Sequence, residues 1–284
     1  MSETGVPPAI AGDPIASLVR EADFDRYASA LFTPAEARAH LLALYAFDAE
    51  VARVRGLVSD PMVGELRLQW WRDALNDPER ADAVAHPVAR ALEGAIRHGR
   101  LPRQALLDLI DARADDLYDD PIATLADLEG RIGATSSVVL RLASLICAEG
   151  ADPGGAEAAG FAGVAQGLAR LLRRLPRSQM LLPIDRMAAH GVTREDLSES
   201  RASPELSRLA AELRDLARRR LAEARSAAAA VDPVAAPAFL PVALVAGDLD
   251  RLDHADSPLA PPPERARWRR LLRLWRASRR TPSF

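Results

Sequence analysis

Residues 41 to 75 read LLALYAFDAEVARVRGLVSDPMVGELRLQWWRDAL and predict two helices joined at a proline. In the first helix, apolar side chains recur at three- and four-residue steps and therefore share one buried face. These side chains are Leu41, Leu44, Phe47, Val51, Val54 and Val58. Asp60 can cap the second helix, in which Pro61 occupies the first position and needs no amide donor. We expect the apolar stripe of this second helix to consist of Met62, Leu66, Trp70 and Ala74.

The composition favours a helical protein with a sizeable core. The chain has 284 residues, of which 49% are hydrophobic but only 5% aromatic, while Ala, Leu and Arg dominate. The formal net charge of -3 argues against a general nucleic-acid binder. All 37 basic residues are arginine, so a Walker-type lysine and a Schiff-base lysine are excluded.

Cysteine usage and hydropathy indicate the compartment. Cys147 is the single cysteine, so neither an intrachain disulfide nor a cysteine zinc cluster can form, which suits a reducing compartment. The start of the chain lacks the charged and apolar regions of a signal peptide. The longest charge-free run, residues 233 to 247, is shorter than the roughly 20 residues of a spanning helix. We therefore expect a cytoplasmic protein, with peripheral contact at the inner membrane as a further option.

Three regions follow from the composition. Residues 1–14 are rich in proline and glycine and predict a flexible tail. Residues 15–256 predict one helical domain, in which Thr33 is expected to cap the helix that begins near Pro34. Residues 257–284 combine a proline-rich connector with a basic C-terminal helix.

The C-terminal helix, residues 264–278, has two interpretations. It carries Trp268, Leu271, Leu272 and Trp275 among six arginines, a composition that could lie on anionic lipid as a peripheral membrane contact. The simpler interpretation, which we favour from the sequence, packs the Trp and Leu side chains on the body of the protein and leaves the arginines in water.

An acidic run also has two interpretations. Six aspartates lie between residues 108 and 120, and three of them share a helical face at i, i+3, i+7 spacing. Such a cluster could hold a metal ion, but Arg113 is interleaved and no histidine accompanies it. A solvated helix face is the favoured interpretation.

Four stretches carry a resemblance to a known family. They are YAFDAEVARVR, GELRLQWWRDAL, GVAQGLARLLRRLPRSQMLLPIDRMAAHGV and FLPVALVAGDLDRL, and the similarity runs from about Tyr27 to about Trp275. The chain resembles the squalene/phytoene synthase family, in particular a divergent branch that includes a mitochondrial complex I assembly factor and its bacterial relatives. This resemblance implies an all-α fold, an isoprenoid-synthase-type helical bundle around a central cavity.

The resemblance also implies a chemistry. Active members of the family condense two prenyl diphosphates head to head, and two aspartate-rich motifs hold the Mg²⁺ ions that neutralise the diphosphate. In this sequence the acidic positions of the first motif fall on Ala52, Arg53 and Gly56. The asparagine and first aspartate of the second motif fall on Arg170 and Arg174, and the segment that carries its last aspartate is shortened to residues 175–178.

Arginine at these positions repels Mg²⁺, so we expect no metal site, no cofactor and no catalytic residue. Three interpretations remain. The first is a pseudoenzyme that binds a respiratory complex I subunit or assembly intermediate. The second is a binder of a prenyl or lipid-like ligand, in which arginines hold an anionic head group. The third is a head-to-head prenyl transferase that uses Mg²⁺ in an altered way. The candidate anion-binding residues are Arg53, Arg170, Arg173 and Arg174, and the candidate cavity-lining residues are Tyr45, Asp48 and Gln166.

Overall fold

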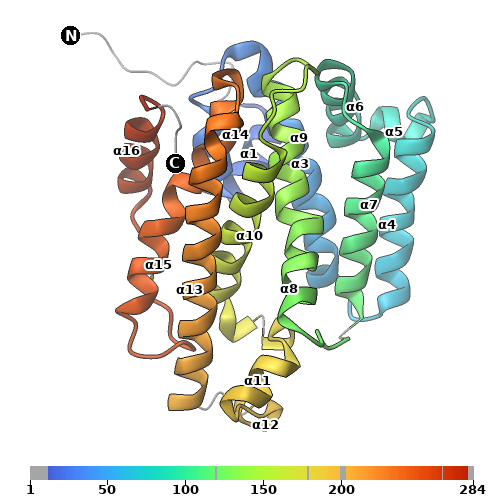
Figure 1. Cartoon of the computed structure of the whole chain (residues 1–284). Coiled ribbons are helices and arrows are strands. Elements are labelled where there is room, and N and C mark those ends of the chain that lie inside the picture. Colours follow the sequence, from blue (N-terminus) through green and yellow to red (C-terminus); the bar gives the residue numbers. More distant parts are fainter. Residues whose placement is uncertain (1–11, 119, 178, 199–202, 264, 281–284) are drawn as a thin grey trace. The chain divides into compact units, whose positions relative to one another are not determined.

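The structure is a computed structural model that describes residues 12–118, 120–177, 179–198, 203–263 and 265–280. Over these residues the regular secondary structure is helical, apart from an isolated bridge between Gly154 and Val231 (Figure 1). The expected all-α class is therefore confirmed. Residues 1–11 of the expected tail lie outside the described residues, and the first helix begins at Pro14.

The chain divides into two compact units, each described by itself. The first unit consists of Met1–Leu117 and Leu142–Pro153, and the second of Tyr118–Arg141 and Gly154–Phe284. The helices of the first unit are α1 (Pro14–Ala22), α2 (Phe24–Ala30), α3 (Ala35–Leu57), α4 (Pro61–Asn76), α5 (Ala81–Ala85), α6 (Pro87–Gly99) and α7 (Arg103–Ala114).

A helical stretch, Leu125–Cys147, begins in the second unit and ends in residues assigned to the first. It consists of α8 (Leu125–Ile132), a π-helical turn (Gly133–Ser137) and α9 (Val138–Cys147). The remaining helices of the second unit are α10 (Ala156–Arg173), α11 (Ile184–His190), α12 (Arg194–Ser198), α13 (Pro204–Ala227), α14 (Ala236–Phe239), α15 (Val245–Asp253) and α16 (Arg267–Ala277), with the 3₁₀ turn η7 (Leu240–Leu244) between α14 and α15.

The helix ends follow local chemistry. Asp60 caps α4, because its carboxylate accepts from the backbone N–H of Met62 at 2.9 Å and Pro61 takes the first helical position. α11 ends at Gly191, which adopts φ 72°. The expected cap at Thr33 is wrong. Pro34 holds the cap position of α3, and the Thr33 hydroxyl is buried without a hydrogen-bond partner in the described residues.

In the first unit the core side of α3 is as expected, but that of α4 is not. Five residues of the predicted α3 stripe are buried, namely Leu41, Leu44, Phe47, Val51 and Val54. In α4, however, the side chains of Met62 and Leu66 are each 65% exposed. Of the predicted stripe Ala74 is buried, and the helix also buries Gly64, Leu68, Trp71 and Leu75. Gly64 packs closely on Leu117, because a Cβ atom there would lie 2.5 Å from Cδ2 of Leu117.

In the second unit α10 is the central helix. It packs along α13 and against the π-helical turn and α15 (Figure 1). Small residues permit this approach. A Cβ atom at Gly163 would lie 2.4 Å from Cα of Ser137, and one at Gly167 would lie 2.2 Å from Cγ2 of Ile132. α10 is therefore tightly packed against the π-helical turn and the end of α8.

The C-terminal helix contradicts the favoured interpretation of its sequence. Trp268, Leu272 and Trp275 are exposed, whereas Arg270 is buried. The helix contacts the body of the second unit through Arg270, Leu274 and Ala277.

Two helical stretches are long and apolar enough to cross a membrane by length and composition alone. They are Leu125–Cys147 and Pro233–Asp253. In each of them more than half of the most apolar 18-residue segment is buried inside the protein. Burial of this kind is also typical of the core helices of soluble proteins.

Candidate functional site

The first candidate site is the carboxylate of Asp48 in the first unit. Asp48 lies on α3 and is only 3% exposed. Arg26 on α2 donates a hydrogen bond to its Oδ2 atom, and Arg113 on α7 donates to its Oδ1 atom at 3.0 Å. The guanidinium of Arg26 also lies 5.2 Å from the centre of the Tyr45 ring. One buried carboxylate therefore joins three helices.

The electrostatics make this site an ion-pair network. Burial alone would raise the pKa of Asp48, but Arg113 and Arg26 outweigh it and hold the pKa well below its usual range. Burial also raises the pKa of the Tyr45 hydroxyl, so this group stays protonated. Because each Asp48 oxygen already accepts from an arginine, the carboxylate lacks the basicity of a general base. Its evident role is to hold α2, α3 and α7 together.

The second candidate site surrounds Asp248 in the second unit. Asp248 lies on α15 and is buried. Arg270 on α16 donates to both of its carboxylate oxygens at 3.0 Å, and Arg173 on α10 donates to Oδ2 at 3.1 Å. Bidentate geometry of this kind gives the strongest arginine–carboxylate pairs. Arg173 is thus part of an ion-pair network, and its guanidinium group already has a carboxylate partner in Asp248.

The structure divides the predicted site residues between the units. Tyr45, Asp48 and Arg53 belong to the first unit, whereas Gln166, Arg170, Arg173 and Arg174 belong to the second. Tyr45 and Asp48 are both buried. Gln166 and Arg170 are half-buried on α10, and Arg174 is exposed just beyond the end of that helix.

Arg53 lies at the edge of a cavity of about 270 Å³ within the first unit. Its side chain is 56% exposed and pairs with Glu50 at 2.6 Å. The other lining residues are Val54, Leu57, Arg67, Trp70, Trp71 and His86. The rings of Trp70 and His86 lie 4.9 Å apart, centre to centre. The guanidinium groups of Arg53 and Arg67 and the neighbouring rings suit a small anion. Glu50, however, already compensates the charge of Arg53.

Residues that complete both networks were missed by sequence reasoning. The missed residues come from helices far apart in the chain, and their spacing does not predict a contact. They are Arg26, Arg113, Asp248 and Arg270. Asp248 carried the clearest signal, since it is an acidic residue between Leu244 and Leu249 on the apolar face of its helix.

The acidic run is a solvated surface where it is described. Asp108, Asp111 and Asp115 are exposed, and Arg72 donates to Asp111 at 2.8 Å. Asp119 lies outside the described residues.

The residues that the sequence resemblance assigns to the first metal-binding motif of the family supply no side-chain oxygen for Mg²⁺. Ala52 has no oxygen ligand and is exposed, Arg53 is a cation, and a Cβ atom at Gly56 would meet no atom within 4 Å. The two buried carboxylates, Asp48 and Asp248, are each already compensated by two arginines. Among the described residues no group of three or more His, Cys, Asp or Glu side chains could hold a metal ion.

The similarity to known proteins identifies the family. The sequence matches the family description "Squalene/phytoene synthase" over residues 19–276. The chain belongs to this family.

Curated relatives share a more particular name. The chain is 31% identical over 243 residues to "NADH dehydrogenase (ubiquinone) complex I, assembly factor 6" of Rattus norvegicus, which covers 84% of this chain and 73% of that protein. It is 30% identical over 243 residues to the Homo sapiens protein of the same name, with the same coverage. It is 32% identical over 197 residues to the Drosophila melanogaster homologue, which covers 66% of this chain and 58% of that protein.

Solved structures support the fold. Squalene synthase HpnC from Alicyclobacillus acidocaldarius is 24% identical and superposes with a TM-score of 0.71, covering 88% of this chain and 96% of that chain. A dehydrosqualene synthase solved with a ligand is 18% identical and superposes with a TM-score of 0.80, covering 95% and 96% respectively. The isoprenoid-synthase-type helical fold implied by the sequence motifs is confirmed.

Proposed function

We propose that this chain is a non-catalytic member of the squalene/phytoene synthase family that acts in assembly of respiratory complex I. The observation that carries the proposal is its identity to complex I assembly factor 6, about 30% over 84% of the chain. On this proposal the chain binds a complex I subunit or an assembly intermediate.

The arginine substitutions support a pseudoenzyme. A prenyl diphosphate carries several negative charges, which the synthases neutralise with divalent cations held by carboxylates. Here the corresponding positions carry Ala52, Arg53 and Gly56 on α3, and Arg170 and Arg174 at the end of α10. A fold persists when its chemistry is lost, so membership of the family is compatible with this proposal.

A second candidate function is head-to-head prenyl diphosphate transfer of the phytoene or squalene synthase type. The description of the family itself favours it. On this alternative the protein would use Mg²⁺ through an arrangement other than the one the sequence comparison assigns.

A ligand remains part of the main proposal. A prenyl or lipid-like molecule with an anionic head group would meet Arg174, which is exposed at the end of α10, whereas Arg173 already pairs with Asp248. We propose that the protein acts in the cytoplasm and at the inner membrane surface, where complex I is assembled.

Deletion of the gene in its host tests the proposal. Loss of a complex I assembly factor should lower the amount of assembled complex I on native gels and lower NADH:quinone activity, and the wild-type gene should restore both. Carotenoid, hopanoid and squalene levels should stay unchanged. Normal complex I together with loss of one of these isoprenoids would contradict the proposal and favour the transferase.

Purified protein provides the matching test of catalysis. It is incubated with farnesyl or geranylgeranyl diphosphate and Mg²⁺, and diphosphate release is measured against a working synthase of the family as the positive control. We expect no release above background. Steady Mg²⁺-dependent release would establish the second candidate function.

A further inference from the structure

The C-terminal helix α16 presents an apolar stripe to solvent. Trp268, Leu272 and Trp275 follow i, i+4, i+7 spacing and therefore lie along one line of the helix. The side chain of Trp268 is 61% exposed and that of Trp275 is 41% exposed, and Leu272 is exposed as well. On the opposite side of the same helix, Arg270, Leu274 and Ala277 are buried. The helix is thus turned with its largest aromatic side chains outward.

Ion pairing explains this orientation. Arg270 enters the second unit and donates to both oxygens of Asp248, while Arg173 holds the same carboxylate from α10. Beside it, the guanidinium of Arg273 covers Gly247, where a Cβ atom would lie 1.6 Å from Nη1 of Arg273. Reversing α16 would bury the tryptophans but expose this carboxylate, so the buried network keeps the apolar stripe in solvent.

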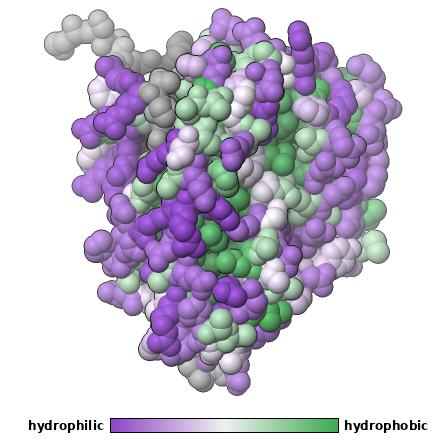
Figure 2. Space-filling view, viewed as in Figure 1, coloured by the Kyte–Doolittle hydropathy of each residue, from purple (hydrophilic) through white to green (hydrophobic). Residues whose placement is uncertain are grey.

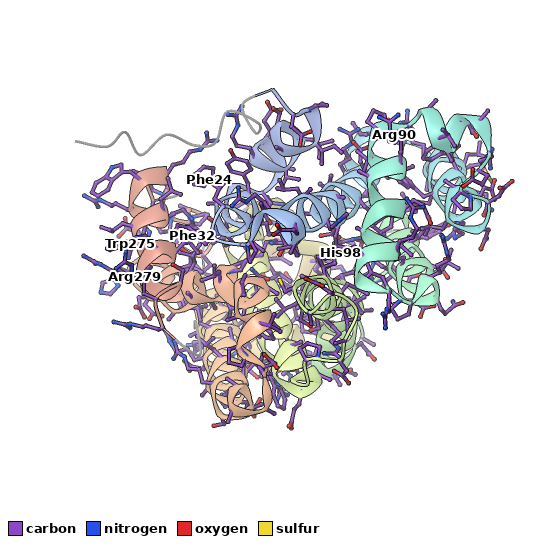
Figure 3. The ribbon with its side chains drawn as sticks, turned by 90° about the horizontal axis from the view of Figure 1, so that it is seen from above. Phe24, Phe32, Arg90, His98, Trp275 and Arg279 are labelled. Carbon is purple, nitrogen blue, oxygen red and sulfur yellow. The ribbon has the colours of Figure 1, made fainter. Side chains whose placement is uncertain are left out.

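Arginines surround the stripe. Residues 265 to 284 contain eight arginines and no acidic residue. Arg269 lies over the ring of Trp268 at 5.1 Å, and Arg279 lies over the ring of Trp275 at 4.2 Å. In Figure 3, Trp275 and Arg279 lie together on the outer side of α16, and Figure 2 shows hydrophilic side chains over this edge.

We propose that α16 binds the surface of an anionic lipid bilayer, with Trp268, Leu272 and Trp275 inserted at the level of the head groups and the arginines beside them. Helices of this kind combine a tryptophan- and leucine-bearing stripe with basic flanks, and indole rings prefer the membrane–water interface. The positive charge complements anionic lipid. This proposal assigns the peripheral membrane contact to α16. It rests on the proposed location at the inner membrane surface and not on a role in complex I assembly.

The charge and shape favour lipid over other partners. Nucleic acid binds aromatic side chains in a basic groove, whereas α16 is a convex helix on a chain of net charge -3. A lone stripe of three apolar residues is narrow for a stable protein interface, but it is sufficient to add to electrostatic attraction at a bilayer.

Flotation of the full-length protein with vesicles is the test. Vesicles contain either phosphatidylcholine alone or phosphatidylcholine with cardiolipin. We expect binding to the anionic vesicles only, a blue shift of tryptophan emission, and weakening of the binding by added salt. Binding to both kinds of vesicle alike, or to neither, would overturn the proposal.

The decisive variant is Trp268→Ser with Trp275→Ser, which should weaken binding to anionic vesicles by about tenfold or more. Its matched control is Met62→Ser with Leu66→Ser on α4, which removes two apolar side chains that are at least as exposed and should leave binding unchanged. Two further double variants test the arginines. One carries Arg269→Gln and Arg276→Gln on α16, and its matched control carries Arg90→Gln and Arg97→Gln on α6. The α16 pair should weaken binding and reduce its salt dependence more than the α6 pair.

Circular dichroism establishes that each variant is folded, which is expected because the substituted side chains are exposed. Equal loss of binding in the α4 control, or full binding by the double tryptophan variant, would refute the role of α16. If single-stranded DNA displaced the protein from vesicles at low concentration, nucleic acid would be the better partner and the proposal would be wrong. Vesicle binding by the purified protein, together with normal complex I in the deletion strain, would refute the assembly function alone.

Discussion

At the scale of single residues, two buried aspartates organise the two units. Asp48 accepts hydrogen bonds from Arg26 and Arg113, and Asp248 accepts them from Arg270 and Arg173. A buried ion pair adds little net stability compared with an apolar replacement, because desolvation offsets the attraction. Removing one partner is costly, however, since the other charge is then left buried. These carboxylates therefore contribute specificity of packing.

The substitution Asp48→Asn should lower the free energy of unfolding by about 3–5 kcal/mol, because Arg26 would remain buried without a full counter-charge. Urea unfolding followed by circular dichroism measures the change. The control is Glu50→Gln, two residues along the same helix, whose partner Arg53 is largely exposed. That control should change stability by less than about 1 kcal/mol. Equal effects of the two substitutions would contradict a structural role for Asp48.

The same site predicts a dependence of stability on pH. The pKa of Asp48 is lower in the folded protein than its ordinary value of about 3.9. Its contribution is therefore fully present above pH ~4 and is lost as the pH falls towards the folded pKa. The difference in unfolding free energy between the wild type and Asp48→Asn should shrink on acidification below that pH. A difference that stays constant down to the acid limit would show that charge is not its cause.

At the scale of elements, the sequence predicted helices better than it predicted their faces. α6 begins at Pro87, and α4 has the cap at Asp60 that its sequence predicts. The apolar residues of α4 and α16 nevertheless point partly to solvent. Periodicity identifies an apolar stripe, but close approach at Gly64 and ion pairing at Asp248 determine which side of each helix is buried.

The packing of α10 predicts opposite changes in the free energy of unfolding for two glycine-to-alanine substitutions on this helix. Gly163→Ala would place a Cβ atom 2.4 Å from Cα and 2.5 Å from N of Ser137, which are backbone atoms. We expect it to lower the unfolding free energy by about 1–3 kcal/mol. At Gly160 a Cβ atom would meet no atom within 4 Å. Gly160→Ala should therefore raise stability by about 0.5–1 kcal/mol through helix propensity. Thermal unfolding compares them, and destabilisation by both would contradict this account of α10.

At the scale of the whole molecule, the chain has the helical fold of the squalene/phytoene synthase family. On the proposed function, the positions that serve the metal ions of the synthases carry Arg53, Arg170 and Arg174 in this chain. The carboxylates of Asp48 and Asp248 are each paired with arginines. We therefore predict that the protein does not bind Mg²⁺ at these positions.

Addition of millimolar Mg²⁺ should accordingly leave the melting temperature unchanged, because only a ligand that binds the folded state raises it. Differential scanning fluorimetry with Mg²⁺, with a chelator and with a prenyl diphosphate measures this. A rise with the diphosphate alone would favour direct recognition of an anionic head group by arginine. A rise that requires both Mg²⁺ and the diphosphate would contradict the pseudoenzyme proposal.

The sequence by itself determined the helical class, the start of α4 and the family. These properties depend on residues close together in the chain: the 3.6-residue period, proline at first helical positions, and short motifs such as YAFDAEVARVR. The proposed departure from the metal-binding pattern also rests on the sequence alone, because it depends on which residue occupies a position.

Only the tertiary structure decided which carboxylates and arginines meet and which faces of α4 and α16 remain in solvent. Asp48 and Arg113 are 65 residues apart, and Arg173 and Asp248 are 75 residues apart. Contacts at such separations depend on how helices pack, which no local period records. The outward tryptophans of α16 follow for the same reason: the buried pair between Arg270 and Asp248 turns the helix, and that pair exists only in the folded protein.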